Sequence, residues 1–115
     1  MGPAILIVES RPEVAEALQD VVGSANYVTI VRPYLDRLCD LGLTPAAIVV
    51  RISSEGVSEP SHGWIERLTE RRPPIVAIAR GETEVREAQR LGCEVILRAP
   101  EDVGQLCDAL SRVVN

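Results

Sequence analysis

Apolar residues follow two different patterns along this chain. Five short, mainly apolar runs predict strands, and the uninterrupted ones predict strands that are covered on both faces. They span residues 4–8, 27–31, 46–50, 75–79 and 93–97. After each run, apolar residues recur every three or four positions, which is typical of amphipathic helices. The pattern therefore predicts five successive strand–helix units.

The first predicted helix has the clearest boundary signals. Ser10 and Glu13 have the spacing of a capping box, Pro12 suits a first helical turn, and Gly23 suits the C-terminal end. A fourth helix is predicted over residues 83–91, and the fifth follows the last strand.

The second and third predicted helices are less regular. One follows Pro33 and ends before Pro45, and the other opens at Trp64 and must end at the two prolines of residues 71–74. A polar loop that continues to about Gly63 precedes the third helix. This loop is long for a connection in a compact domain.

Strands that alternate with helices through short loops imply right-handed crossovers and a parallel sheet. For five units we expect a flavodoxin-like three-layer α/β fold with strand order 2-1-3-4-5. The 115 residues are 46% hydrophobic and 25% charged, which suits a single domain over residues 1–115.

Composition narrows the function classes. The net charge of -5 disfavours direct binding to nucleic acid or to an anionic membrane. No apolar run approaches the roughly 20 residues that span a bilayer, and the start lacks a secretory pattern, so we expect a cytoplasmic protein. The chain has no lysine, which excludes any mechanism that needs a lysine amine.

The residues that end the strands carry the most information about chemistry, because open α/β sheets bind ligands beyond the carboxyl ends of their strands. The first strand ends at Glu9 and the third at Arg51. In the expected order these strands are neighbours, roughly 5 Å apart. The two side chains should therefore be able to meet.

Three segments, in this order and spacing, resemble the receiver domain of bacterial response regulators over essentially the whole chain. Residues 5–14 look like its opening strand, acidic pair and first helix, and residues 74–81 like its fourth strand. Residues 87–100 are similar to its fourth helix, fifth strand and terminal Lys-Pro. The resemblance implies the fold named above and a place in two-component signal transduction.

The family's chemistry is phosphorylation of an aspartate that ends strand three, with magnesium held by that aspartate and an acidic pair after strand one. Here the aspartate position is Arg51, and the acidic pair is Glu9 and Ser10. The hydroxyl residue of strand four is Ala79, and the usual lysine is Arg98. The resemblance thus implies a pseudo-receiver, a receiver scaffold without phosphotransfer chemistry, with no cofactor, no bound metal and no enzymatic activity.

Two family positions can be matched in either of two registers. The aromatic switch residue corresponds to Val95, or to Ile96 when the match is anchored on Pro100. In that second register the lysine position becomes Ala99 instead of Arg98. Neither register restores an aromatic side chain or an amine.

Three arrangements of Arg51 remain open from the sequence. It could pair with Glu9 and replace the metal and phosphate network by a permanent ion pair. It could bind an anion or small ligand as a sensor, together with other residues near strand ends, namely Arg80, Arg98, Ser10, Ser53 and Ser54. It could also point into solvent.

The remaining reactive residues favour structural roles. The three cysteines, Cys39, Cys93 and Cys107, are scattered and expected to be buried, and His62 is expected in a loop. In receivers the fourth helix, fifth strand and fifth helix form the usual dimer or partner surface. The corresponding charged and polar residues are Glu84, Arg86, Glu87, Arg90, Asp102, Gln105, Asp108 and Arg112. We expect a signalling module that acts through protein contacts, either with other signalling proteins or an output domain, or in a homodimer through this surface.

Overall fold

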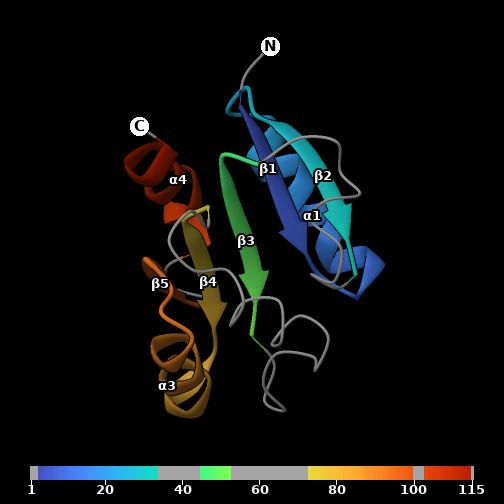
Figure 1. The fold of residues 1–115 in the computed structure, drawn as a ribbon. Helices are drawn as coiled ribbons and strands as arrows, with labels where there is room; N and C mark the ends of the chain where they lie inside the picture. The colour runs from blue at the N-terminus through green and yellow to red at the C-terminus, as the bar shows by residue number, and fades with distance from the viewer. Residues whose placement is uncertain (1–2, 34–44, 53–72, 100–102, 115) are drawn as a thin grey trace.

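Five parallel strands form one sheet in the order β2-β1-β3-β4-β5 (Figure 1). This computed structural model describes residues 3–33, 45–52, 73–99 and 103–114. The strands are β1 (Ala4–Val8), β2 (Val28–Arg32), β3 (Ala47–Arg51), β4 (Ile75–Ala79) and β5 (Val95–Arg98). The predicted flavodoxin-like fold and strand order are confirmed.

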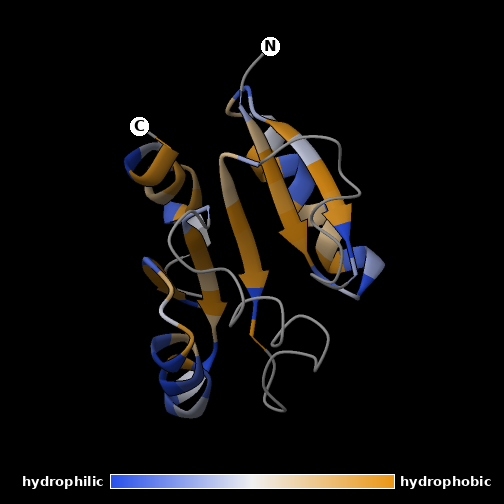
Figure 2. Cartoon of the chain, in the orientation of Figure 1, coloured by the Kyte–Doolittle hydropathy of each residue, from blue (hydrophilic) through white to orange (hydrophobic). Residues whose placement is uncertain are grey.

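Burial explains the composition of the strands. The side chains of β4 are buried along its whole length, and those of β3 are buried up to its last residue, Arg51. Continuous apolar runs are expected where helices cover both faces of a parallel sheet. The edge strand β2 is half-exposed, and its sequence is correspondingly more polar at its end. Figure 2 shows the strands as hydrophobic for most of their length.

Helices pack on both faces of the sheet. On one face lie α1 (Pro12–Gly23) and α4 (Leu106–Val114), whose Leu18, Val22 and Leu110 join the apolar cluster around Ile5 and Val49. A short 3-10 helix, η2 (Val103–Gln105), precedes α4. On the opposite face lies α3 (Gly81–Arg90), which buries Val85 and Ala88 against a second cluster and exposes a hydrophilic surface (Figure 2).

The predicted capping box of the first helix is wrong. The N-cap of α1 is Arg11, and no side chain caps this end of the helix. Instead, the amide of Arg11 donates a 3.0 Å hydrogen bond to Glu9 Oε1. Pro12 does occupy the first turn as expected, because its missing N–H leaves no donor unsatisfied there.

Several predictions fall outside the described residues. These are the helices after Pro33 and at Trp64, the polar loop that continues to Gly63, and the positions of Cys39 and His62. Within the part of the chain that the structure describes, no helix is long and apolar enough to cross a membrane.

Candidate functional site

The site lies at the carboxyl edge of the three central strands. Val8 in β1 pairs with Val50 in β3, and Arg51 pairs with Ile78 in β4, so the three strands end at the same level. Backbone hydrogen bonds continue past the strand ends. The amide of Glu9 donates to Arg32 O at 3.0 Å, and that of Ile52 donates to Ile78 O at 2.8 Å. Glu9 and Arg51 are therefore held on a rigid part of the sheet.

Arg51 and Glu9 form a two-pronged ion pair. Arg51 Nε donates to Glu9 Oε2, and Arg51 Nη2 donates to Glu9 Oε1 at 3.2 Å. The planar guanidinium matches a carboxylate in this fork arrangement, which fixes orientation as well as charge. Of the three arrangements open from the sequence, the structure contains the pair with Glu9.

The Glu9 carboxylate is buried and fully engaged. Its side chain is 2% exposed, whereas that of Arg51 is 26% exposed. With the amide of Arg11, the carboxylate accepts three hydrogen bonds. A buried carboxylate is costly unless it is paired and hydrogen-bonded. The arginine supplies the positive charge that this carboxylate needs.

The environment also stabilises the charged form of Arg51. The hydrogen bond that Arg51 donates to Glu9 is the largest cause that raises the pKa of Arg51 above its ordinary value. Partial burial lowers this pKa, but the negative charges of Glu9 and Glu84 raise it further. The guanidinium therefore stays charged at any pH at which the protein is handled.

The other residues of the predicted degenerate pocket contribute little chemistry. Ser10 is exposed in a bend, and Ala79 is buried as the last residue of β4. Arg98 is exposed at the end of β5, where the following residue, Ala99, donates its amide to Ala79 O at 2.8 Å. Among the residues that the structure describes, no group of three potential metal ligands lies together.

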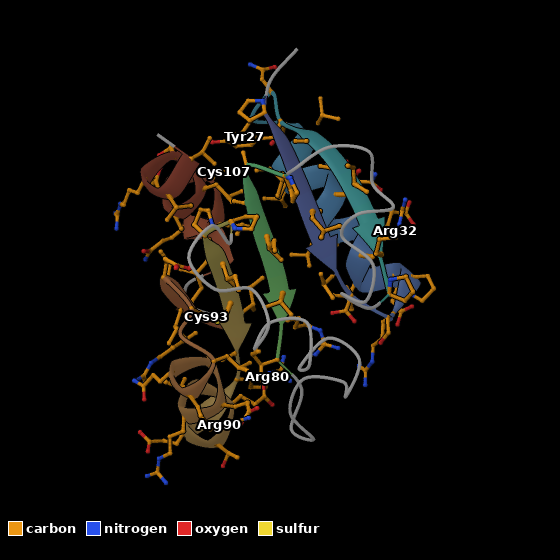
Figure 3. The ribbon with its side chains drawn as sticks, viewed as in Figure 1. Tyr27, Arg32, Arg80, Arg90, Cys93 and Cys107 are labelled. Atoms are coloured by element: carbon orange, nitrogen blue, oxygen red, sulfur yellow. The ribbon has the colours of Figure 1, made fainter. Side chains whose placement is uncertain are left out.

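A cavity of about 470 Å³ opens beside the ion pair. The polar residues of its lining, within the described part of the chain, are Arg11, Arg51, Arg80 and Glu84. Figure 3 labels Arg80 at the point where β4 ends and the chain enters α3. The sequence analysis missed Arg11, although its position two residues after Glu9, where the first strand ends, was a usable signal.

The arginine set expected for an anion site is only partly assembled. Arg51 and Arg80 line the cavity, but Arg98 is not among its lining residues. Ser53 and Ser54 lie outside the described residues. Two of the three arginines predicted for an anion site therefore border this cavity.

The predicted partner surface is partly paired within itself. On α3, Arg86 Nη2 lies 3.3 Å from Glu82 Oε2, and Arg90 Nη2 lies 2.6 Å from Glu87 Oε1. Glu84 lines the cavity instead, and its carboxylate accepts a 2.9 Å hydrogen bond from the amide of Arg80. On η2 and α4 the exposed members are Gln105, Asp108 and Arg112, while Asp102 lies outside the described residues.

Neither described cysteine is fully buried, which corrects the expectation from the sequence. Cys93 and Cys107 are both half-buried. Cys107 Sγ lies 3.5 Å from Val21 O, at the contact between α4 and α1. Cys93 packs at the rim of the apolar cluster under α3. Both positions are far more consistent with packing than with a reactive centre.

The strand order and the helices on both faces of the sheet define a flavodoxin-like receiver fold. The sequence itself matches no family model and no curated protein. Among solved structures, the chain is similar to the BeF3-activated receiver domain of RstA from Klebsiella pneumoniae, with 16% identity and a TM-score of 0.75. The match covers 97% of this chain and 98% of that one.

Two further solved structures show the same likeness. The receiver domain of the Francisella response regulator 1452 has 14% identity and a TM-score of 0.78, covering 98% of this chain and 97% of that one. A signal receiver domain of a histidine kinase from Syntrophus aciditrophicus has 22% identity and a TM-score of 0.77, covering 98% and 90%. At these identities the likeness establishes the fold.

Proposed function

We propose that this chain is a pseudo-receiver, a signalling module of two-component signal transduction that acts through protein contacts and without phosphorylation. Its output is set by which proteins it binds, and it catalyses no reaction. We infer a cytoplasmic location, as for a module that contacts other signalling proteins. The receiver folds of its structural neighbours support the signalling role.

One observation carries the proposal, namely the guanidinium of Arg51 on the Glu9 carboxylate. In a receiver the corresponding residue of β3 is an aspartate that accepts the phosphoryl group and helps to hold magnesium. Arg51 offers no nucleophilic oxygen. Its guanidinium is bound to the Glu9 carboxylate, which is the group that a metal ion at this position would need as a ligand. Ala79 provides no hydroxyl group that could respond to a phosphoryl group.

The proposed partner surface is formed by α3, β5 and α4, which are the fourth helix, fifth strand and fifth helix of the sequence-based prediction. Its charges are mixed in sign, with Glu87, Arg90, Asp108 and Arg112 among them. Mixed charges suit intersubunit salt bridges and favour orientation and specificity over raw affinity. We therefore propose a homodimer or a complex with another signalling protein through this surface.

The proposal that the chain is not phosphorylated is tested by incubation with acetyl phosphate or beryllofluoride and magnesium. Intact mass and amide NMR spectra are recorded before and after, with an intact receiver domain as positive control. We expect no added phosphoryl mass and no shift of the amides of Glu9, Arg51 and Ala79. A phosphoryl adduct, or a saturable spectral response to beryllofluoride, would contradict the proposal.

The proposed association through the surface of α3, β5 and α4 is tested by sedimentation velocity over a range of protein concentrations. Charge reversal of Arg112, as Arg112→Glu, is expected to weaken a homodimer through this surface. Reversal of Arg32, which lies on the far edge strand β2, serves as the control. A dimer that resists the first change and responds to the second would place the interface elsewhere.

A further inference from the structure

The geometry points to a binding site for a small organic acid, a monoanionic carboxylate with an apolar body, in the cavity between the N-terminal ends of α1 and α3. This site goes beyond the proposed signalling role and does not depend on it. The cavity of about 470 Å³ falls within the range typical of small-molecule sites.

Two guanidiniums at this cavity are available for a ligand. Within the part of the chain that the structure describes, the side chains of Arg11 and Arg80 make no hydrogen bond or ion pair, and both residues are exposed. Arg51, in contrast, is already bound to Glu9. Guanidinium groups bind carboxylates in a planar, two-pronged geometry.

The charged residues at the cavity favour a ligand with a single negative charge. Arg11, Arg51 and Arg80 border the cavity together with Glu84, and Glu9 is bound to Arg51 behind it. Among the residues that the structure describes here, three guanidiniums against two carboxylates leave one uncompensated positive charge. A doubly charged phosphate would exceed this charge and would lie near the Glu84 carboxylate.

The backbone dipoles of two helices add to the positive electrostatic potential in the cavity. Arg11 and Arg80 are the N-caps of α1 and α3, and neither helix has a side-chain cap at that end. Both positive helix ends border one cavity, because the two arginines and Val14 and Glu84 from the first turns all line it. Aligned peptide dipoles favour an anion at such a position.

The rest of the lining is apolar, which distinguishes this site from a site for an inorganic ion. The other described residues of the wall are five aliphatic ones, namely Val14, Ile52, Ile78, Ala79 and Ala99. Ile52, Ile78 and Ala79 are buried, so they form the closed side of the cavity. A carboxylate among the arginines would place an aliphatic or aromatic body against this wall.

The test uses benzoate and hexanoate as probes, with benzamide and inorganic phosphate as comparisons, in calorimetric and ligand-observed NMR titrations of the whole chain. We expect saturable binding of both carboxylates, at least about tenfold tighter than benzamide or phosphate. Arg11→Gln and Arg80→Gln should each weaken benzoate binding by about tenfold, as expected for loss of one charge-assisted contact. The control Arg32→Gln, an exposed arginine at the end of β2 outside the cavity lining, should leave binding unchanged.

Each alternative result decides against the site as proposed. Equal binding of benzamide would show an apolar pocket without anion recognition, and tighter binding of phosphate would show a simple anion site. Absence of saturable binding by every probe would also overturn it. Circular dichroism melting of each variant verifies that the fold is kept, so that weaker binding reports on the arginine itself.

Discussion

Replacing Arg51 with alanine should destabilise the protein by about 2 kcal/mol. Breaking a fully buried ion pair by removing one partner costs about 3–5 kcal/mol, because the other charge stays buried without compensation. An exposed pair is worth less than about 1 kcal/mol. Glu9 is almost completely buried, but the 26% exposure of Arg51 lets water approach the carboxylate, so the value lies between these limits. For a domain of this size it corresponds to a fall in melting temperature of about 8 °C.

The ionic part of this loss is isolated by a double-mutant cycle with Arg51→Ala and Glu9→Gln. Glutamine keeps an oxygen that can accept the amide hydrogen bond of Arg11, so mainly the charge is removed. Urea unfolding followed by circular dichroism gives the free energy of unfolding of each variant. We expect a coupling energy of at least about 1 kcal/mol between the two sites.

The matched control is the pair Glu82 and Arg86 on α3. These side chains are 76% and 79% exposed and lie 3.3 Å apart at helical spacing. The same cycle there should give about 0.3–0.5 kcal/mol. A Glu9–Arg51 coupling no larger than that of the control pair would refute the conclusion that a buried ion pair organises this edge of the sheet.

Three further predictions use the same unfolding assay. Arg51→Lys should recover less than half of the stability lost in Arg51→Ala, because an ammonium group cannot form the two-pronged pair with Glu9; full recovery would show that charge alone matters. The stability difference between the native chain and Arg51→Ala should stay constant from about pH 7 to about pH 10. The raised pKa of Arg51 adds stability that is fully present below the unfolded-state pKa. This stability is lost only as the pH rises through the still higher folded-state pKa. A stability difference that declines between about pH 7 and about pH 10 would therefore contradict the raised pKa. Gly81→Ala should destabilise by about 1 kcal/mol, because Gly81 has φ +80° in otherwise open space, whereas Gly23→Ala, in α1 and equally open, should stabilise by up to about 0.5 kcal/mol; the opposite order would contradict both backbone assignments.

The strands could be predicted from the sequence because each is mainly apolar, and β1 and β4 are apolar throughout. β4 has the predicted bounds, and β3 begins and ends one residue later than predicted. That small shift makes Arg51 the last residue of β3, paired with Ile78. Parallel pairing and strand order followed from the alternation of strands and helices alone, since few topologies are compatible with it. The meeting of Glu9 and Arg51 followed from that order.

The polar contacts around the site could not be predicted, because they depend on competition between neighbouring donors and acceptors. Ser10 has the sequence spacing of an N-cap, but the Glu9 carboxylate takes the amide of Arg11 and the helix begins one residue later. The helical spacing of the sequence predicts that Glu84 lies on an exposed helix face. In the structure it turns toward the cavity, because the Arg80 amide donates to it. Local periodicity carries no information about such choices.

The strength of the ion pair also decides how this edge of the sheet can be regulated. A pair that contributes about 2 kcal/mol holds the unpaired arrangement to about 3% of the molecules, if nothing else distinguishes the two states. A ligand or partner shifts that population only by its difference in affinity for the two arrangements. Ligands that contact Arg11 and Arg80 while leaving Arg51 on Glu9 would bind without opposing the pair. A ligand that captures Arg51 must first compensate the buried Glu9 carboxylate, so a switch built on this ion pair would depend on Arg51.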